Sequence, residues 1–255
     1  MRFSGKTAII TGAGSGIGKA AAGKLAAEGA AVILAGRTME KLEAAAEEIN
    51  QLYEEQRAFP FKADVTKEED VNRLAEFAWS IGPADILINN AGGSKQSKIL
   101  ETSIEDWDSV QAANLKSVFL VSKIIGARMK DTEVESGRDR AIVNVASLSG
   151  YKAGAHIPHY SAAKAGVINL TRALALELSP FGIRANSVSP GFVETPLTEA
   201  GLENPKFTEA IKRSTALKRV GKPEEIANII AFAASAEASY MTGTDLLADG
   251  GWLIV

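Results

Sequence analysis

The fold of this chain is decided by residues 6–18, which read KTAIITGAGSGIG. The β-branched run from Lys6 to Thr11 is typical of a short buried strand. Glycines then recur at every second position from 12 to 18, and an alanine-rich helical stretch follows over residues 19–28. A glycine turn between a strand and a helix lets the backbone approach a pyrophosphate, whose charge the helix N-terminus faces. The order strand, turn, helix therefore predicts an α/β fold with a nucleotide-phosphate site.

The spacing within the turn is Gly-x-x-x-Gly-x-Gly, because Ile17 stands where the commoner G-x-G-x-x-G pattern has its last glycine. A merely flexible glycine turn is the alternative interpretation, and the strand and helix on either side disfavour it. We expect phosphate contacts from the residues of the turn, namely Gly12, Ser15, Gly16, Ile17 and Gly18.

The end of the second strand bears on the choice of dinucleotide. Residues 31–35 form the expected strand, and Gly36 and Arg37 follow it. Enzymes that use NAD usually place an acid here to bind the ribose hydroxyls, whereas an arginine can pair with a 2′-phosphate. Ser15 lies where some NADP users carry a basic residue, so half of the NADP pattern is present. The sequence favours NADP over NAD, with a merely solvated Arg37 as the alternative.

The remaining chain alternates strands with amphipathic helices, without a repeat or a linker. We expect further strands at 58–62 (at the sheet edge, because of Pro60), 85–89, 141–145, 184–188 and 245–248. Helices are predicted over residues 39–53, 103–130 and 157–178. Two more are predicted to begin after Thr66, as an N-cap residue, and at Pro223. We therefore expect residues 1–255 to form a single α/β domain, with a substrate lid around 192–215.

Composition excludes several classes of protein. Of the 255 residues 46% are hydrophobic and 23% charged, the net charge is −3, and there is no cysteine. Disulfides and thiolate chemistry are therefore excluded, and the absence of a basic block argues against a nucleic-acid partner. The first residues lack the apolar core of a secretory signal, and no apolar run could span a bilayer. We expect a cytoplasmic protein without a membrane partner.

Small and polar side chains follow the central strands. Asn90, Ala91 and Gly92 come directly after residues 85–89, and Ser147 follows residues 141–145. Ligands of open α/β sheets bind at the carboxyl ends of the strands, so these residues are placed to meet one. Asn114 falls in the middle of the helix predicted over 103–130, where it is either a buried hydrogen-bonding bracket or a site residue.

Tyr160 and Lys164 are four positions apart, so on a helix they share one face. Lowering the pKa of a tyrosine by about three units requires roughly 4 kcal/mol. An ammonium about 4 Å away supplies roughly that amount at an effective dielectric of about 20. The pair can therefore act as a general acid/base without histidine or metal. His156 and His159 are three apart with no acid nearby, so we expect no metal site.

Taken together, these motifs resemble the short-chain dehydrogenase/reductase family over nearly the whole chain. They include the turn from Thr11 to Gly18, the run Asn89-Asn90-Ala91-Gly92, and Tyr160 with Lys164. Asp64, Asn114, Ser147 and the segment from Pro190 through Gly191 to Thr195 complete the family order.

The resemblance implies a Rossmann-type, doubly wound sheet of seven parallel strands and a tetrad of Asn114, Ser147, Tyr160 and Lys164. By analogy Tyr160 exchanges a proton with the substrate oxygen, Ser147 hydrogen-bonds that oxygen, and Lys164 lowers the pKa of Tyr160 and binds the nicotinamide ribose. Asn114 would hold a water that connects Lys164 to solvent. Further cofactor contacts would come from Asp64, Val65, Asn90, Ala91, Gly92, Pro190, Gly191, Val193 and Thr195. Substrate contacts would come from Ser147, Ser149, Tyr160 and Phe192.

Family members are commonly tetramers, so a homotetramer or homodimer is expected. The favoured function is an NADPH-dependent reductase of a small ketone or the reverse dehydrogenase. The alternatives are an NAD-dependent sugar, polyol or steroid dehydrogenase and, less favoured, a non-catalytic dinucleotide sensor.

The motifs are similar to those of 3-oxoacyl-carrier-protein reductases, with two departures. Leu176 stands where those enzymes carry a docking arginine, and Asp131, Glu133 and Glu135 have the wrong charge for an acidic carrier. A carrier-bound substrate is therefore disfavoured, and the sequence leaves the substrate open.

Overall fold

The computed structural model describes residues 1–133 and 137–255. Across these residues, seven strands pair in parallel in the order β3-β2-β1-β4-β5-β6-β7. Their bounds are Thr7–Thr11 (β1), Ala31–Gly36 (β2), Ala58–Lys62 (β3), Ala84–Asn89 (β4), Arg140–Val145 (β5), Ile183–Pro190 (β6) and Asp245–Ala248 (β7). The predicted seven-stranded sheet is confirmed, and β3 with its Pro60 is an edge strand as expected.

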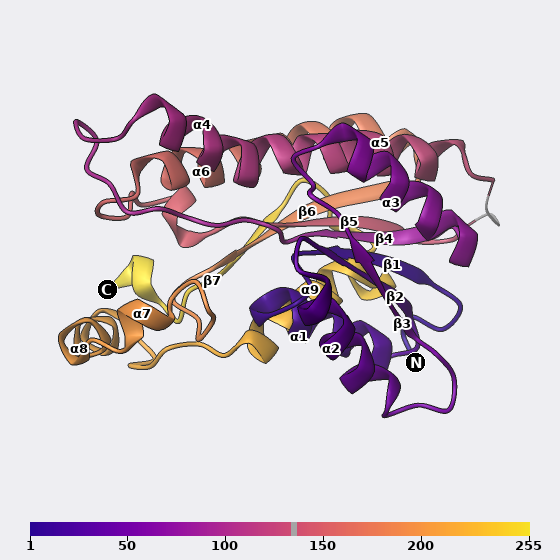
Figure 1. Ribbon diagram of the computed structural model, residues 1–255, viewed down its shortest axis with the longest axis horizontal. Helices are drawn as coiled ribbons and strands as arrows, with labels where there is room; N and C mark the ends of the chain where they lie inside the picture. The colour runs from indigo at the N-terminus through magenta and orange to yellow at the C-terminus, as the bar shows by residue number, and fades with distance from the viewer. Residues whose placement is uncertain (134–136) are drawn as a thin grey trace.

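Helices cover both faces of the sheet (Figure 1). One face packs against α1 (Gly16–Ala27), α2 (Met39–Asn50) and α9 (Pro223–Ala234). The other packs against α3 (Glu68–Ile81), α5 (Ser117–Asp131) and α6 (Pro158–Leu178). No helix within residues 1–133 or 137–255 is long and apolar enough to span a bilayer.

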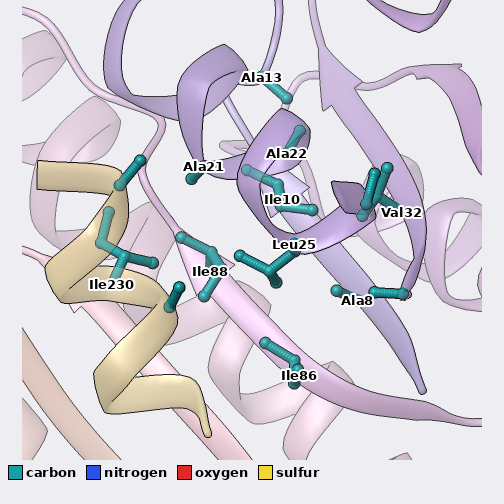
Figure 2. Packing of buried hydrophobic residues seen from close by; sticks show 14 of the residues in the cluster. Ala8, Ile10, Ala13, Ala21, Ala22, Leu25, Val32, Ile86, Ile88 and Ile230 are labelled. Atoms are coloured by element: carbon teal, nitrogen blue, oxygen red, sulfur yellow. The ribbon is translucent and has the colours of Figure 1, made fainter. Parts of the chain in front are cut away.

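The alternation of strand side chains explains the two layers. Ile10 and Ile88 point to one face, where they pack with Leu25 of α1 and Ile230 of α9 (Figure 2). The next residue along β1, Ile9, belongs to the opposite core. Because successive side chains of a strand point to opposite faces, a continuous apolar strand supplies both layers.

The helix predicted over 103–130 is interrupted. It consists of α4 (Ile104–Gln111), a π-helical turn at Ala112–Lys116 and α5. The Asn114 amide nitrogen donates to the Val110 carbonyl at 2.8 Å, four residues back. It thereby competes with the backbone N–H for that acceptor, which favours the wider turn.

Two predicted helix ends were wrong. The N-cap residue of α3 is Lys67 and not Thr66, because the Thr66 hydroxyl donates to the Asp64 carboxylate at 2.7 Å. Helix α2 ends at Asn50 and does not reach Tyr53, because the Asn50 side chain accepts the Ala58 N–H at 2.8 Å and turns the chain toward β3.

The segment predicted as a lid lies between β6 and α9. It contains two short helices, α7 (Glu199–Leu202) and α8 (Pro205–Ser214), to one side of the sheet (Figure 1). Asn204 caps α8 by accepting the Lys206 N–H at 3.0 Å. The segment therefore has regular local structure, which the sequence reading had not assigned.

Candidate functional site

The candidate site lies where the carboxyl ends of β1, β4, β5 and β6 come together. These four strands are neighbours in the sheet, and the strand order reverses between β1 and β4. A crevice outside the strand ends at such a switch point is where open α/β sheets bind ligands. The glycine turn, Asn90, Ser147 and Gly191 all follow these strands, so the fold brings the predicted segments together.

The glycine turn is shaped by contacts that only glycine permits. Gly12 has φ +66°, and a Cβ there would lie 2.9 Å from the Asn90 side chain. At Gly18, on the first turn of α1, a Cβ would overlap the Asn90 amide nitrogen and the Gly12 carbonyl. Ser15 precedes α1 with an extended backbone and, among the described residues, its side chain does not cap the helix. The first N–H groups of α1 therefore remain available for an anion.

A cavity of about 250 Å³ opens beside this turn. Seven of the predicted cofactor residues line it, namely Gly12, Ser15, Arg37, Asp64, Val65, Ala91 and Gly92. The Gly36–Thr38 segment, Lys41 and Leu42 also line it. Lys41 was not predicted from the sequence, although a second cation four residues after Arg37 was a usable signal.

The Asn90 side chain holds the glycine turn. Its amide nitrogen donates to the carbonyls of Thr11 at 3.0 Å and Gly12 at 3.1 Å. The Thr11 hydroxyl in turn accepts the Ala91 N–H at 3.0 Å. These bonds join the ends of β1 and β4, so the Asn90 side chain supports the cavity wall through backbone groups.

The predicted cofactor residues outside the cavity lining lie around it. Thr195 stands over the turn, since a Cβ on Gly16 would be 3.3 Å from its side chain. Val193 is buried and forms an isolated bridge with Gly221. Gly191 follows Pro190 at the end of β6, and its N–H donates to the Ala248 carbonyl at 2.9 Å. Ile17 packs against the core cluster beneath α1.

The Tyr160–Lys164 pair lies on the first turns of α6. The Lys164 Nζ is 5.6 Å from the centre of the Tyr160 ring and donates to the Val145 carbonyl at 2.7 Å. Lys164 is only 4% exposed, and burial lowers its pKa to about 8. An ammonium held this way is positioned by β5 and is easily deprotonated.

The direction predicted for the Tyr160 pKa was wrong in this structure. Burial raises the pKa of Tyr160, and a hydrogen bond with the Ser147 side chain opposes the rise. Removal from water disfavours the phenolate more than the nearby groups stabilise it. The phenol is therefore protonated at neutral pH and faces Ser147.

Asn114 acts as a bracket within its surroundings. It is fully buried, its amide nitrogen donates to the Gly93 carbonyl at 2.7 Å, and its oxygen accepts the Gly93 N–H at 3.2 Å. A Cβ on Gly92 would lie 2.6 Å from that oxygen and 3.8 Å from the Lys164 Nζ. The π-helical turn, the loop after β4 and the buried lysine thus meet at Gly92.

The predicted substrate residues surround the open end of the site. Ser147 accepts the Ser149 N–H at 3.1 Å, which turns the chain after β5. The Phe192 ring follows β6 and packs against Trp252, with ring centres 4.8 Å apart. Trp252 near the C-terminus was not predicted to approach the site, because nothing local in the sequence places it there.

The two histidines do not form a metal site. His159 is fully buried, and its Nδ1 accepts the Tyr160 N–H at 3.1 Å. Within the described parts of the chain, no group of three His, Cys, Asp or Glu side chains could hold a metal ion.

The site combines a glycine-lined phosphate turn, a cavity beside that turn and a tyrosine–lysine pair at the ends of the neighbouring strands. These features together define a class of enzymes. The class is that of oxidoreductases that bind a nicotinamide dinucleotide on an open α/β sheet. Comparison with known proteins gives the family.

Residues 12–253 match the family described as Enoyl-(Acyl carrier protein) reductase. The chain is 40% identical to the 3-oxoacyl-(acyl-carrier-protein) reductase FabG of Thermotoga maritima, over 100% of both chains. It is 38% identical to the meso-2,3-butanediol dehydrogenase of Serratia marcescens, over 98% of this chain and 96% of the other. A solved short-chain type dehydrogenase/reductase from Mycobacterium marinum superposes with a TM-score of 0.91 at 36% identity, covering 99% of this chain and 97% of that one. The protein belongs to the short-chain dehydrogenase/reductase family and is an oxidoreductase acting on CH–OH groups.

Proposed function

We propose that this protein is an NADP(H)-dependent oxidoreductase that interconverts a small ketone and a secondary alcohol, with Tyr160 as the general acid/base. The proposal rests on one observation above all. A protonated tyrosine in hydrogen-bonding contact with Ser147 stands over a buried lysine at the strand ends beside the glycine turn. That arrangement suits proton transfer to an oxygen on which negative charge develops.

Each member of the tetrad then has a separate task. Tyr160 donates its proton to the carbonyl oxygen during reduction, and takes it back during oxidation. Ser147 donates a hydrogen bond to the same oxygen and stabilises its developing charge. Lys164, whose pKa is about 8, can resupply the proton and stabilise the phenolate that reduction leaves behind. Asn114 positions the loop after β4 through Gly93.

The site fits a dinucleotide because at several glycines the backbone lies so close to neighbouring groups that no side chain could be added. Cβ atoms at Gly12, Gly18 and Gly92 would meet Asn90 or Asn114. The glycine turn and the first turn of α1 would hold the pyrophosphate, and Lys164 the nicotinamide ribose. When bound, the nicotinamide supplies or accepts the hydride.

The NADP preference is supported by the two cations of the cavity. Arg37 and Lys41 both line it beside Gly36. A 2′-phosphate on the adenine ribose would meet complementary charge there, whereas NAD would leave both cations without a partner from the ligand.

A small substrate is favoured over a carrier-bound one. Leu176, which stands where the carrier-protein reductases have a docking arginine, is 77% exposed and offers no charge to an acidic carrier. Asp131 adds a negative charge at the end of α5. Glu135, which the sequence reading also used, lies outside the described residues.

The proposal includes a homotetrameric or homodimeric, cytoplasmic protein. Exposed apolar side chains at the β7 edge and the C-terminus support assembly, namely Leu247, Ile254 and Val255.

The substitution Tyr160→Phe tests the mechanism. It should lower kcat by about 10²- to 10⁴-fold, the range that general acid–base catalysis provides, because the proton donor is lost while the ring stays. Initial rates of NADPH oxidation would be measured with a panel of aliphatic, cyclic and sugar carbonyls. NADPH affinity, from fluorescence titration, should change less than about threefold.

Tyr53→Phe serves as the matched control, since Tyr53 lies beyond the end of α2 and its ring centre is 4.2 Å from the Arg57 guanidinium carbon. Undiminished turnover in Tyr160→Phe would overturn the mechanism. If the wild-type protein does not bind NADPH, it can be neither the proposed NADPH-dependent enzyme nor an NADPH sensor. That result would overturn the proposed function.

A further inference from the structure

The last residues of the chain form a tight turn built on one buried carboxylate. Asp249 is 9% exposed, and its two oxygens accept the N–H groups of Gly251 at 2.8 Å and Leu253 at 2.9 Å. Gly251 has φ +82°, a conformation that favours glycine. Through this turn the chain reverses after β7 and presents Trp252.

This C-terminal turn, residues 249–253, contacts both ends of the lid segment. At the entrance, a Cβ on Gly191 would lie 2.6 Å from the Asp249 Cα, so backbone packs directly on backbone. At the exit, the Leu217 N–H donates to the Gly250 carbonyl at 3.0 Å. A Cβ on Gly251 would be 2.7 Å from the Ala216 side chain. The two ends of the lid therefore rest on one support.

Aromatic rings connect that support to the interior of the lid. The Trp252 ring is 4.8 Å from Phe192, tilted by 59°, and Phe192 is 5.5 Å from Phe207 of α8 in an edge-to-face arrangement. Phe192 is thus held between the C-terminal turn and the second lid helix. Such ring pairs have preferred geometries and resist rotation of the central ring.

We infer that Trp252 is a positioning residue of the active site, which acts through Phe192 to hold the lid over the substrate. The inference deepens the proposed function, since it gives the role of substrate contact to Phe192. It also predicts that the substrate presents an apolar group to the Phe192 ring. Removing the Trp252 ring should free Phe192 and α8 while the dinucleotide cavity, which Trp252 does not line, stays intact.

The experiment is a double-mutant cycle on lid opening that needs no substrate. Wild type, Trp252→Ala, Phe192→Ala and the double variant would be treated with trypsin, with cleavage inside α8 at Lys206, Lys212 and Arg213 followed by mass spectrometry. Cleavage of a native protein follows the population of the opened segment. Trp252→Ala should speed cleavage by about tenfold, the effect of losing one ring pair. Phe192→Ala should speed it by at least as much, because it loses the pairs with both Trp252 and Phe207, and the double variant should match Phe192→Ala.

Trp252→Phe, which retains a ring, should stay within about twofold of wild type. If Trp252→Ala fails to melt cooperatively, Trp252→Leu takes its place, since it keeps apolar volume and loses the ring. Unchanged cleavage in the Trp252 variants, or rate increases that multiply in the double variant, would overturn the inference.

An activity measurement separates this inference from the proposed function. With whichever carbonyl compound the wild type reduces, Trp252→Ala should raise KM by about tenfold. The affinity for NADPH should stay within about twofold. If the protein has no reductase activity but the Trp252 and Phe192 variants still show the coupled cleavage, the proposed function is refuted. The link from Trp252 through Phe192 to α8 would nevertheless stand. An active protein whose KM ignores Trp252 would refute the positioning role.

Discussion

Lys164 illustrates at the residue scale how burial prepares a group for chemistry. Its ammonium is nearly inaccessible and has the Val145 carbonyl as its partner. A carbonyl dipole compensates only part of the hydration that a charge loses, so the pKa falls to about 8. The same burial raises the pKa of Tyr160, so the phenol holds its proton more tightly than the ammonium does. A proton can therefore pass from the ammonium to a tyrosine phenolate in the favourable direction.

The Lys164 pKa has a consequence for stability against pH. Its pKa is about 8 in the folded protein against 10.5 for the free side chain, so between these values the unfolded chain binds more protons. The free energy of unfolding should therefore rise with pH through this window, by about 3 kcal/mol at about 1.36 kcal/mol per unit. Urea unfolding of wild type and Lys164→Met at pH 7 and pH 10, at one protein concentration, measures it. A difference between the two proteins that stays constant with pH would contradict the assignment.

Arg37 should set the choice between the two dinucleotides. Arg37→Asp removes a cation from the cavity and adds an anion, which would repel a 2′-phosphate and suit free ribose hydroxyls. The ratio of kcat/KM for NADPH to kcat/KM for NADH should fall by about tenfold to a hundredfold, because a hydrogen bond to a charged group contributes about 1.5–3 kcal/mol. Arg73→Asp, on the exposed face of α3, is the control. A ratio left unaltered would refute the role of Arg37.

At the element scale, the glycine turn and the start of α1 form one unit with the loop after β4. Asn90 bonds two carbonyls of the turn, and Gly18 lets α1 approach them. The turn conformation is thus held by a side chain that lies far away in the sequence. Its shape depends on contacts between elements more than on the intrinsic flexibility of glycine.

Two alanine substitutions within α1 separate these contributions. Gly18→Ala should weaken NADPH binding by at least tenfold and lower the melting temperature, because its Cβ would overlap Asn90 and the Gly12 carbonyl. Gly23→Ala lies in the same helix, where nothing among the described residues comes within 4 Å of the added Cβ. It should stabilise the protein by about 1 kcal/mol, the difference in helix propensity. Thermal melts would measure the stability of the two variants, and titration would measure their affinity for NADPH. If both variants had the same melting temperature and the same affinity, the steric explanation would be excluded.

The π-helical turn shows how one side chain alters an element. Asn114 bonds Val110 within its own helix and Gly93 across the site. Of the two alternatives for its mid-helix position, these hydrogen bonds show the bracket, and a role as a site residue stays a prediction. It is a buried bracket, and the loop that it fixes lies against Lys164.

At the scale of the whole molecule, the two edges of the sheet differ. Strand β3 carries Pro60, which cannot donate to a further strand. Strand β7 has exposed Leu247, and nearby Ile254 and Val255 are also exposed. An apolar, unprotected edge is a surface for pairing with another chain, which fits the proposed homo-oligomer.

Leu247→Glu should weaken that assembly. A charge at a symmetric interface faces its own copy, so the dissociation constant should rise at least about tenfold. Light scattering after size-exclusion chromatography, over a dilution series, measures the mass. Leu52→Glu is the control, since Leu52 is 72% exposed just beyond the end of α2. If the wild-type protein is monomeric at all concentrations, the proposed homo-oligomer is refuted.

The parts of the molecule that were predictable share a local origin. Apolar strands such as Asp85–Asn89 carry their own periodicity and length, and β4 has nearly those bounds. The strand–turn–helix order at residues 6–18 and the spacing of Tyr160 and Lys164 are likewise contained in neighbouring residues. The wrong helix ends at Thr66 and Tyr53, and the interruption of the predicted helix at Asn114, arose where a polar side chain formed a hydrogen bond that no propensity describes.

The amino-acid sequence by itself determined the strands and the residues able to do acid–base and phosphate chemistry, because those depend on periodicity and on chemical type. The doubly wound order followed from the resemblance of its motifs to a known family. Only the tertiary structure decided that burial raises the Tyr160 pKa and lowers that of Lys164, that Lys41 joins Arg37, and that Trp252 reaches Phe192. Desolvation and contact depend on which distant segments cover a group. They exist only once the sheet has brought those segments to the same edge.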